Sequence, residues 1–352
     1  MNKNKNKVAL ITGITGQDGA YLAKFLLEKN YIVYGTYRRL STPNFWRLQY
    51  LGIKDKINII PLELADSSSI LAAIEISNPD EIYNLAAQSF VGSSFENPIY
   101  TTDVSGLGVV RLLEIVRQYH PKVKLYQAST SEMYGDNRSG VLSEETSFIP
   151  SSPYAAAKLA GHHSIKIYRE SYNLFLSNGI LFNHESPLRG LEFVTRKITN
   201  EVAKIKLGLS KSISLGNIKS SRDWGYAPDY VEAMWKILQH DKPLDIVIAT
   251  NTNYTVEDFL NEACMHVDID YKDFLKVDKK YLRPLDVNYL RGDNSKANKI
   301  LGWKPTVTFK DLVKLMVDAD LERWNAYKEG RHIPWDALNY PSENDNISFD
   351  KK

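Results

Sequence analysis

Residues 8–20 read Val8-Ala-Leu-Ile-Thr-Gly-Ile-Thr-Gly-Gln-Asp-Gly-Ala20, and the organisation of the chain follows from this stretch. An apolar run ends at Gly13, glycines recur every three residues, and a helical pattern follows from Tyr21 to Glu28. The pattern predicts a strand, a tight turn and a helix. Glycine lets a pyrophosphate approach the turn, where the free N–H groups and dipole of the helix face the anion. The spacing differs by one residue from the dinucleotide fingerprint, and the alternative is an ordinary strand-to-helix turn. A second strand at Tyr31–Thr36, which closes a unit of about thirty residues, favours the nucleotide site.

The overall composition is ordinary for a water-soluble globular protein. Of the 352 residues 43% are hydrophobic and 24% charged, and the formal net charge is +2. So small an excess charge leads us to expect neither a nucleic-acid partner nor a membrane partner. The one cysteine, Cys264, allows no intramolecular disulfide, which fits a reducing cytoplasm. The apolar run Val8–Ile11 is too short for an export signal, and no stretch reaches the length of a membrane span. We therefore expect a cytoplasmic protein.

Strand-like and helix-like patterns alternate along the first half of the chain. Further strands are predicted at Ile57–Pro61, Glu81–Leu85, Lys124–Ser129 and Phe175–Leu181, and helices at Ser67–Ile76, Thr102–Tyr119 and Pro153–Tyr172. Such alternation is typical of a parallel sheet with helices on both faces. The predicted fold class is α/β, with a Rossmann-type doubly wound parallel sheet and a smaller mixed α/β substrate-binding lobe.

The alternation breaks down beyond Phe182. Helices are predicted at Phe193–Leu207 and Asp229–Gln239 and strands at Ser212–Gly216 and Asp245–Ala249, with short helices and loops after Thr255. Since no linker separates the lobes, the chain must cross between them more than once. We predict a cofactor-binding Rossmann domain over 1–182 to which 219–250 return, a substrate-binding lobe from 183–218 and 251–330, and a polar, loosely ordered tail over 331–352.

The end of the second strand indicates which nicotinamide cofactor is bound. NAD-binding folds place a carboxylate there to bond the ribose 2′-hydroxyl. In this chain the strand Tyr31–Tyr37 ends in Arg38 and Arg39 with no carboxylate nearby. Two guanidinium groups would hold a 2′-phosphate through charge-assisted bonds. The alternative is a solvated basic turn, but beside the glycine turn the pair favours NADP.

Four residues form a candidate catalytic group. Tyr154 and Lys158 lie four residues apart at the start of a predicted helix, so they project from one face. A lysine ammonium beside a phenol would lower the pKa of Tyr154 and make it a base for a sugar hydroxyl. Thr130 and Glu132 follow the fifth strand, at the sheet edge where ligands bind. A reductase needs only the tyrosine and the lysine, whereas an added carboxylate indicates proton abstraction beside a carbonyl. The alternative is that Glu132 is a helix-capping acid or an exposed acid in a loop.

At this point the motifs resemble the GDP-mannose 4,6-dehydratases, of the extended short-chain dehydrogenase/reductase superfamily. The likeness covers nearly the whole chain except the tail. Its most specific part is Asn183 to Lys197, which the wider superfamily does not share. The motifs that carry it are the glycine turn, Tyr83-Asn-Leu-Ala-Ala-Gln-Ser89, Tyr126-Gln-Ala-Ser-Thr-Ser-Glu-Met-Tyr134, Ser152-Pro-Tyr-Ala-Ala-Ala-Lys158, Gly179-Ile-Leu-Phe-Asn-His-Glu-Ser-Pro-Leu-Arg-Gly190, Phe193-Val-Thr-Arg-Lys-Ile198, Ser221-Arg-Asp-Trp-Gly225, Arg283-Pro284 and Leu301-Gly-Trp-Lys-Pro305.

The resemblance implies a dehydration without net redox change. Tyr154, helped by Thr130 and Lys158, would deprotonate the sugar 4-hydroxyl while hydride leaves C4 for NADP+. Glu132 would then remove the C5 proton and protonate the departing 6-hydroxyl, and hydride would return to C6. The product would be GDP-4-keto-6-deoxy-D-mannose.

The resemblance also implies a set of binding residues. The expected cofactor-binding residues are Gly13, Thr15, Gly16, Gln17, Asp18, Gly19, Arg38, Glu63, Leu64, Leu85, Ala86, Ala87, Ser89, Tyr100, Tyr154, Lys158, His184 and Arg189. The expected substrate-binding residues are Ser89, Thr130, Glu132, Asn183, Lys197, Arg222 and Arg283, with the cations facing the diphosphate. No metal is expected, because neither His184 nor the pair His162-His163 has other ligands at metal-binding spacing.

Several positions depart from the family pattern. Ser151, Ile149, Ala160 and His163 replace residues that are larger in the family, Glu63 stands for Asp, and Asn288 stands for an acid. Smaller residues near the site could admit GDP-D-glycero-D-manno-heptose, which is the alternative substrate. A nucleotide-sugar epimerase or reductase is a second alternative, and a redox-sensing NADP-binding protein without catalysis a third. The family assembles as homodimers or homotetramers, and since Leu40–Trp46 differs from relatives, the choice between these states stays open.

Overall fold

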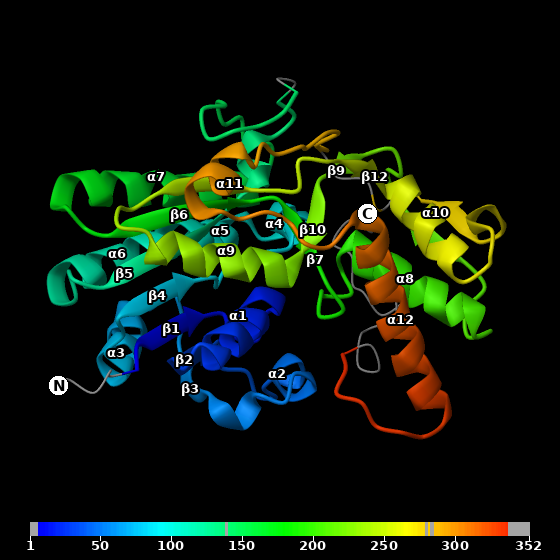
Figure 1. Ribbon diagram of the computed structural model, residues 1–352, viewed down its shortest axis with the longest axis horizontal. Helices are drawn as coiled ribbons and strands as arrows, with labels where there is room; N and C mark the ends of the chain where they lie inside the picture. Colours follow the sequence, from blue (N-terminus) through cyan, green and yellow to red (C-terminus); the bar gives the residue numbers. More distant parts are fainter. Residues whose placement is uncertain (1–5, 138–139, 279–280, 282–284, 337–352) are drawn as a thin grey trace.

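The centre of the computed structural model is a seven-stranded sheet. The structure describes residues 6–137, 140–278, 281 and 285–336. The strand order is β11-β6-β5-β4-β1-β2-β3, and every pair is parallel (Figure 1). The strands are β1 Val8–Thr12, β2 Ile32–Tyr37, β3 Asn58–Pro61, β4 Glu81–Asn84, β5 Lys124–Thr130, β6 Leu176–Leu181 and β11 Asp245–Ile248. The predicted doubly wound α/β fold is confirmed.

Helices cover both faces of this sheet. One apolar core joins the sheet to α1 and α9, with side chains such as Leu26 and Met234. A second core joins the other face to α3, α6 and α7, with side chains such as Ile70, Leu112 and Ile165. These helices and their short neighbours are α1 Gln17–Glu28, α2 Trp46–Tyr50, η1 Lys54–Lys56, α3 Ser67–Ser77, α4 Val91–Glu96, α5 Pro98–Thr102, η2 Asp103–Leu107, α6 Gly108–Tyr119, η3 Ser131–Tyr134, α7 Pro153–Tyr172, α9 Ala227–Gln239 and α11 Ser295–Leu301.

Helix α7 matches its predicted bounds, but the predicted helix Thr102–Tyr119 is wrong in detail. It consists of the end of α5, the π-helical turn η2 and helix α6. Close packing at two glycines accompanies the turn: a Cβ at Gly106 would lie 3.3 Å from the Ala157 carbonyl oxygen, and one at Gly108 would lie 3.0 Å from the Leu64 Cβ. Apolar periodicity continues through such a turn, so the sequence pattern does not reveal it.

A second lobe has its own apolar core. Ile198, Phe259, Leu260 and Met316 lie at its centre. Its elements are β7 Asn183–Glu185, α8 Val194–Lys206, β8 Ile213–Leu215, β9 Ser221–Arg222, β10 Trp224–Tyr226, β12 Tyr254–Thr255, α10 Val256–His266, η4 Tyr271–Asp273, β13 Leu275–Val277 and α12 Phe309–Lys328. Among the residues described, no helix is both long enough and apolar enough to cross a bilayer.

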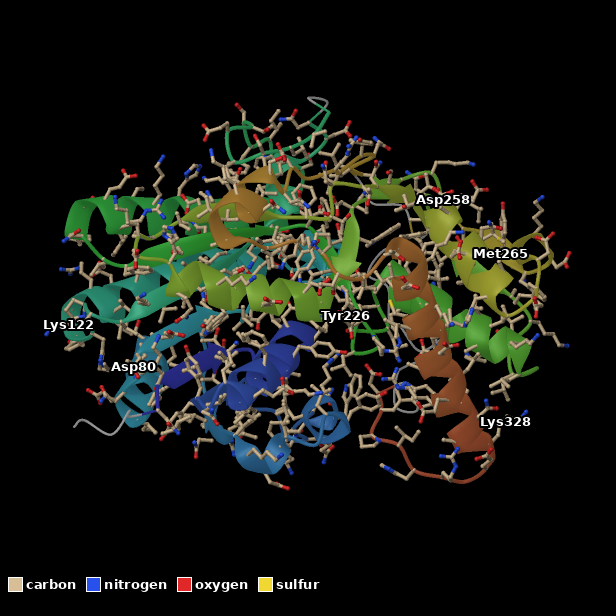
Figure 2. All side chains as sticks on the ribbon, in the orientation of Figure 1. Asp80, Lys122, Tyr226, Asp258, Met265 and Lys328 are labelled. Carbon is tan, nitrogen blue, oxygen red and sulfur yellow. The ribbon has the colours of Figure 1, made fainter. Side chains whose placement is uncertain are left out.

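The strands of the sheet run toward the second lobe. Asp80 and Lys122, just before β4 and β5, lie at the far left in Figure 2, while Asp258 and Met265 of α10 lie at the opposite side. The carboxyl ends of the strands therefore face the second lobe. Ligands of open parallel sheets bind at such an edge.

The expected loose tail is wrong where the structure describes it. Trp335 is buried and packs edge-on against Trp324 of α12, with ring centroids 4.6 Å apart. The remainder of that tail, 337–352, lies outside the described residues.

Candidate active site

A cavity of about 1480 Å³ lies between the carboxyl edge of the sheet and the second lobe. Most of the predicted catalytic and substrate residues line it. Thirteen predicted residues contribute to its wall, namely Asp18, Leu85, Ala87, Ser89, Thr130, Glu132, Tyr154, Lys158, Asn183, His184, Arg189, Lys197 and Arg222.

Other predicted residues lie outside this wall. They belong to the glycine turn, to the segments that follow the strands or, for Tyr100, to helix α5, and they are Gly13, Thr15, Gly16, Gln17, Gly19, Arg38, Glu63, Leu64, Ala86 and Tyr100. Arg283 falls outside the described residues.

The glycine turn joins β1 to α1 closely. Gly13 has φ +72°, and a Cβ there would lie 3.0 Å from the backbone of Ala86. At Gly19 a Cβ would lie 2.5 Å from the Gly13 carbonyl oxygen, so a side chain would push the helix away. At Gly16 a Cβ would meet only that same oxygen, at 3.4 Å, so the protein leaves open space in front of this residue.

A histidine–carboxylate pair lies where the turn meets the second lobe. The Asp18 Oδ2 is 2.8 Å from His184 Nε2, and the other ring nitrogen is 2.7 Å from the Phe182 carbonyl oxygen. Gln17 donates to the His184 carbonyl oxygen, and Tyr230 stacks on the ring at 4.5 Å. Burial opposes ionisation of Asp18, but the charge and hydrogen bond of His184 outweigh it and lower the pKa of Asp18 to about 2. Burial likewise opposes protonation of His184, yet Asp18 raises the pKa of that ring.

Arg38 lies on the exposed rim beyond the end of β2. Its Nη1 donates to the Tyr100 hydroxyl oxygen at 2.6 Å. Arg38 and Tyr100, which were predicted separately as cofactor-binding residues, are therefore in contact.

Tyr154 and Lys158 project from the first turns of α7. Ser152 caps this helix by accepting from the Ala155 N–H at 3.1 Å, and Pro153 occupies its first turn. The Lys158 ammonium donates to the Ala128 carbonyl oxygen at 2.7 Å and lies 6.0 Å from the centre of the Tyr154 ring. Burial lowers the pKa of Lys158 to about 8.

The pKa of Tyr154 differs from the sequence-based expectation. Burial and, to a smaller extent, the Glu132 charge raise the pKa of the phenol to about 12, with a hydrogen bond from Thr130 opposing them. The expected lowering of this pKa by Lys158 is therefore wrong, because burial dominates. The Lys158 ammonium donates to the Ala128 carbonyl oxygen.

Glu132 is placed by a short helical turn after β5. The turn η3 begins after Thr130, whose Oγ1 accepts from the Glu132 N–H at 3.2 Å. Glu132 is buried and lines the cavity. The alternative of an exposed loop acid is excluded by this position.

Cations from the second lobe line the opposite wall. Lys197 Nζ lies 3.7 Å from the centre of the Tyr281 ring, and Arg222 Nη2 lies 3.9 Å from Asp286 Oδ1. Arg189 Nε lies 3.1 Å from Glu185 Oε2, and its guanidinium lies over the Phe193 ring. A negatively charged ligand part would find its partners on this wall.

Among the wall residues that sequence reasoning missed are Glu185, Tyr281 and Asp286. The buried Glu185 accepts from the Thr195 hydroxyl at 2.6 Å, and burial raises the pKa of its carboxyl. Its position beside His184 in a quoted motif was a signal that could have found it. Asp286 follows Arg283-Pro284 but carries no local pattern of its own.

The departures from the family pattern lie away from the cavity. Ala160 and His163 are exposed on α7, and neither they nor Ile149 or Ser151 line the wall. The expectation that these smaller residues enlarge the sugar site is wrong. Their side chains belong to the outer surface of α7 and to the loop before it.

Comparison with known proteins gives the family. The model described as GDP-mannose 4,6 dehydratase matches residues 10–316. The chain belongs to this family. It is 51% identical over 326 residues to GDP-mannose 4,6 dehydratase 1 of Arabidopsis thaliana, covering 90% of each chain. It is 48% identical over 347 residues to GDP-mannose 4,6 dehydratase of Homo sapiens, covering 92% of this chain and 93% of the relative. The resemblance seen in the motifs is confirmed.

The fold is shared more widely than the family. The structure of dTDP-glucose 4,6-dehydratase from Bacillus anthracis in complex with NAD superposes with a TM-score of 0.80 at 21% identity. The match covers 92% of this chain and 99% of that one. At this identity the likeness supports the Rossmann-type fold alone.

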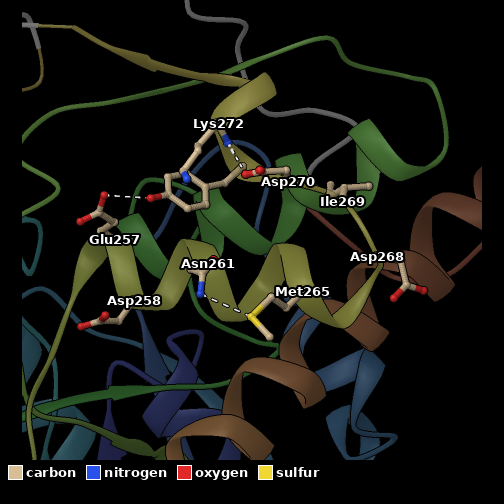
Figure 3. Close-up of a pocket in the computed structure, with 9 residues that line it drawn as sticks. Glu257, Asp258, Asn261, Met265, Asp268, Ile269, Asp270 and Lys272 are labelled. Carbon is tan, nitrogen blue, oxygen red and sulfur yellow. Dashed lines mark hydrogen bonds between the residues drawn. The ribbon is translucent and has the colours of Figure 1, made fainter.

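A second hollow, of about 770 Å³, lies on the second lobe between helix α10 and the segment that follows it (Figure 3). Its polar groups bond to one another: the Tyr271 hydroxyl donates to Glu257 at 3.0 Å, and Asn261 contacts the Met265 sulfur at 3.4 Å. Within the described ranges no group of three or more His, Cys, Asp or Glu side chains could hold a metal. We assign no function to this hollow.

Proposed function

We propose that the protein is a GDP-mannose 4,6-dehydratase, which forms GDP-4-keto-6-deoxy-D-mannose and water with NADP as an internal hydride carrier. The observation that carries the proposal is the joint placement of Thr130, Glu132, Tyr154 and Lys158 on one wall of the cavity. Family membership supports the same activity.

The residues present fit a dinucleotide. Open space in front of Gly16 and the N-terminus of α1 suit a pyrophosphate, and the Arg189 guanidinium, paired with Glu185 at 3.1 Å, adds a positive charge on the lobe side of the cavity. Arg38, on a strand end without a carboxylate, supports NADP over NAD. A bound nicotinamide would supply the hydride acceptor for the sugar C4 and the hydride donor for C6.

The protein side chains handle the protons. Tyr154 accepts the proton of the sugar 4-hydroxyl, and the hydrogen bond with Thr130 stabilises the phenolate. The 4-keto group acidifies the C5–H bond, and Glu132 takes that proton. The same carboxyl then protonates the 6-hydroxyl, which leaves as water, and the proton held by Tyr154 returns to C5 when hydride adds to C6.

The diphosphate has its partners on the opposite wall. Lys197 and Arg222 face the cavity from α8 and β9. The buried Asn183 Oδ1, unpartnered among the described residues, would accept a hydrogen bond from a hydroxyl of the nucleotide sugar. Charge-assisted bonds to a diphosphate would orient the sugar toward Tyr154. Arg283 is proposed for the same role from the resemblance alone.

The first test is turnover of the purified protein with GDP-mannose and with GDP-D-glycero-D-manno-heptose, followed by mass spectrometry. We expect loss of one water from the mannose compound at the higher rate. Preference for the heptose compound would overturn the sugar assignment. No loss of water from either, with NADP+ supplied, would overturn the dehydratase proposal.

Replacing Glu132 tests the chemistry. Glu132→Gln removes the proton carrier, so dehydration should fall about 10²- to 10⁴-fold, while bound cofactor, measured by absorbance, is retained. Glu145→Gln, at an exposed glutamate, is the control and should keep full activity. An epimerase or reductase needs no carboxylate at position 132, so activity that survives Glu132→Gln would favour that alternative.

We also propose a homodimer or homotetramer in the cytoplasm. Exposed apolar side chains on neighbouring helices support assembly: Ile99 of α5 is 85% exposed and Ile167 of α7 is 58% exposed. Light scattering of the purified protein measures the mass, and a monomer would contradict the proposal.

A further inference from the structure

Three side chains of α7 form one stripe that faces β5. Tyr154, Lys158 and His162 are spaced by four residues, so they lie one above another on the helix. Each contacts a different one of the last three residues of β5, 128–130. Tyr154 bonds to Thr130, and Lys158 donates to the Ala128 carbonyl oxygen. His162 Nδ1 lies 3.1 Å from the Ser129 hydroxyl oxygen. The first two contacts belong to the catalytic group, and the third has no assigned role.

The hydrogen bonds around Ser129 determine which atom donates. Asn178 Nδ2 donates to Asp245 Oδ1 at 2.9 Å and to the His162 carbonyl oxygen at 3.3 Å. Both amide hydrogens are used, so Asn178 Oδ1 is an acceptor, and Ser129 Oγ donates to it at 3.3 Å. A hydroxyl has one hydrogen. The bond between Ser129 and His162 therefore needs the hydrogen on His162 Nδ1, which makes the neutral ring an Nδ1–H tautomer.

The chain of hydrogen bonds ends at an ion pair. Arg169, also on α7, donates to both Asp245 oxygens at 2.9 and 2.7 Å. The chain thus runs from α7 through β5, β6 and the start of β11 back to α7. Burial lowers the pKa of His162 to about 4, with Asp245 opposing and His163, Arg169 and Lys166 adding small downward effects. The ring is neutral at ordinary pH, as the tautomer requires.

We propose that His162 is a positioning residue for the dehydration: its bond to Ser129 holds α7 in place along β5, and so holds Tyr154 and Lys158 against Thr130 and Ala128. This inference rests on the proposed function, because it assigns His162 to the geometry of that reaction. Small displacements of a catalytic base are costly: a misplacement of 1 Å lowers rates by about 10²-fold.

Kinetics of matched variants test the proposal. His162→Leu removes the hydrogen-bond donor but keeps a side chain of similar size. We expect kcat to fall roughly tenfold and KM to change by less than about twofold. The limb of the kcat pH profile that reports the ionisation of Tyr154 should also move. His162→Asn keeps a nitrogen donor near the position of Nδ1 and should restore most of kcat. His163→Leu is the control, since His163 is the exposed neighbour and lies edge-on to the rings of Phe148 and His162. Ser129→Ala combined with His162→Leu should cost little more than either alone, because both remove one bond.

Either of two kinetic outcomes would overturn the proposal: His162→Leu with the kcat and pH profile of the unchanged protein, or a loss at His163→Leu of equal size. An Nε2–H tautomer of His162 in the ¹⁵N NMR spectrum of the unaltered protein would overturn the assignment of His162 as the donor to Ser129. That spectrum needs no turnover, so it still decides the hydrogen-bond chain if neither GDP-sugar is dehydrated and the proposed function fails.

Discussion

The two walls of the cavity are built by different means. The sheet wall, comprising Thr130, Glu132, Tyr154 and Lys158, comes from one strand end, one short turn and the helix α7. The lobe wall, comprising Asn183, Arg189, Lys197, Arg222 and Asp286, comes from separate segments spread over the rest of the chain. Hydrogen bonds between the paired elements β5 and α7 position the sheet wall, and the bond from Lys158 to the Ala128 carbonyl oxygen joins residues 30 apart in sequence. Behind the lobe wall the contacts span longer separations, and the pair Arg196–Asp320 joins residues 124 apart.

The clearest long-range contact behind the lobe wall is a buried ion cluster. Arg196 of α8 and Asp320 of α12 are fully buried and pair at 2.7 Å. Arg196 also donates to the carbonyl oxygens of Pro187 and Arg189, at 3.0 and 2.9 Å. The loop that carries Arg189 is thus held by one buried guanidinium. We infer that damage to this cluster affects folding before chemistry, while damage to the sheet wall affects chemistry before folding.

The largest expected effect on stability is at Asp320. Asp320→Asn leaves the buried Arg196 without a full counter-charge, so the free energy of unfolding should fall by about 3–5 kcal/mol. Denaturant titration measures it. The matched control is Asp318→Asn on the same helix, at a half-exposed carboxylate 2.6 Å from His266, which should cost less than about 1 kcal/mol. Equal losses in the free energy of unfolding for the two variants would contradict the inference that the lobe wall depends on the buried ion cluster.

The difference between the two walls also explains which features could be predicted from the sequence. Tyr154 and Lys158 were predictable because helical spacing places them on one face, after a Ser–Pro start that caps a helix. The strands were predictable because their apolar runs are continuous in a sheet buried on both faces. Within the sheet wall, the pKa of Tyr154 was not predictable, because it depends on how deeply the fold buries the phenol.

Of the lobe wall, the resemblance alone indicated Asn183, Arg189, Lys197 and Arg222, and nothing in the sequence indicated Asp286. Lys197 and Arg222, taken singly, read as surface charges. Arg196 and Asp320 are 124 residues apart in sequence, and no local sequence pattern predicts that they pair. Trp335 shows the same limit, since a single aromatic in a polar stretch gives no sign that it packs on Trp324.

The second prediction concerns the point where the walls meet, the pair Asp18–His184. The pKa of Asp18 falls from 3.8 to about 2, so its contribution is present above pH 3.8 and is lost as pH falls toward 2. The pKa of His184 is raised above 6.5, so its contribution is present below pH 6.5 and is lost as pH rises through the raised value. The pair should therefore stabilise the protein most between these limits.

Asp18→Asn measures that contribution. The variant should be less stable than the unaltered protein by about 1–2 kcal/mol near pH 5, a reduced figure because water in the cavity screens the partly exposed carboxylate. Unfolding by denaturant at several pH values should show the difference shrinking toward pH 2 and again above neutrality. A difference that does not vary with pH would mean that the pair is not ionised, and that the walls meet through neutral hydrogen bonds.

The smallest effects come from matched helix caps, one behind each wall. Ser152 accepts from the Ala155 N–H at 3.1 Å at the start of α7, and Thr308 accepts from the Asp311 N–H at 3.2 Å at the start of α12. Replacing either with Ala should lower the free energy of unfolding by about 1 kcal/mol. Only Ser152→Ala should also lower kcat, because the turn that it caps carries Tyr154, whereas the first turn of α12 contributes nothing to the cavity. An equal loss of kcat for Thr308→Ala would mean that the lobe wall positions the reacting sugar as closely as the sheet wall does. The inference that the two walls act separately on folding and on chemistry would then be wrong.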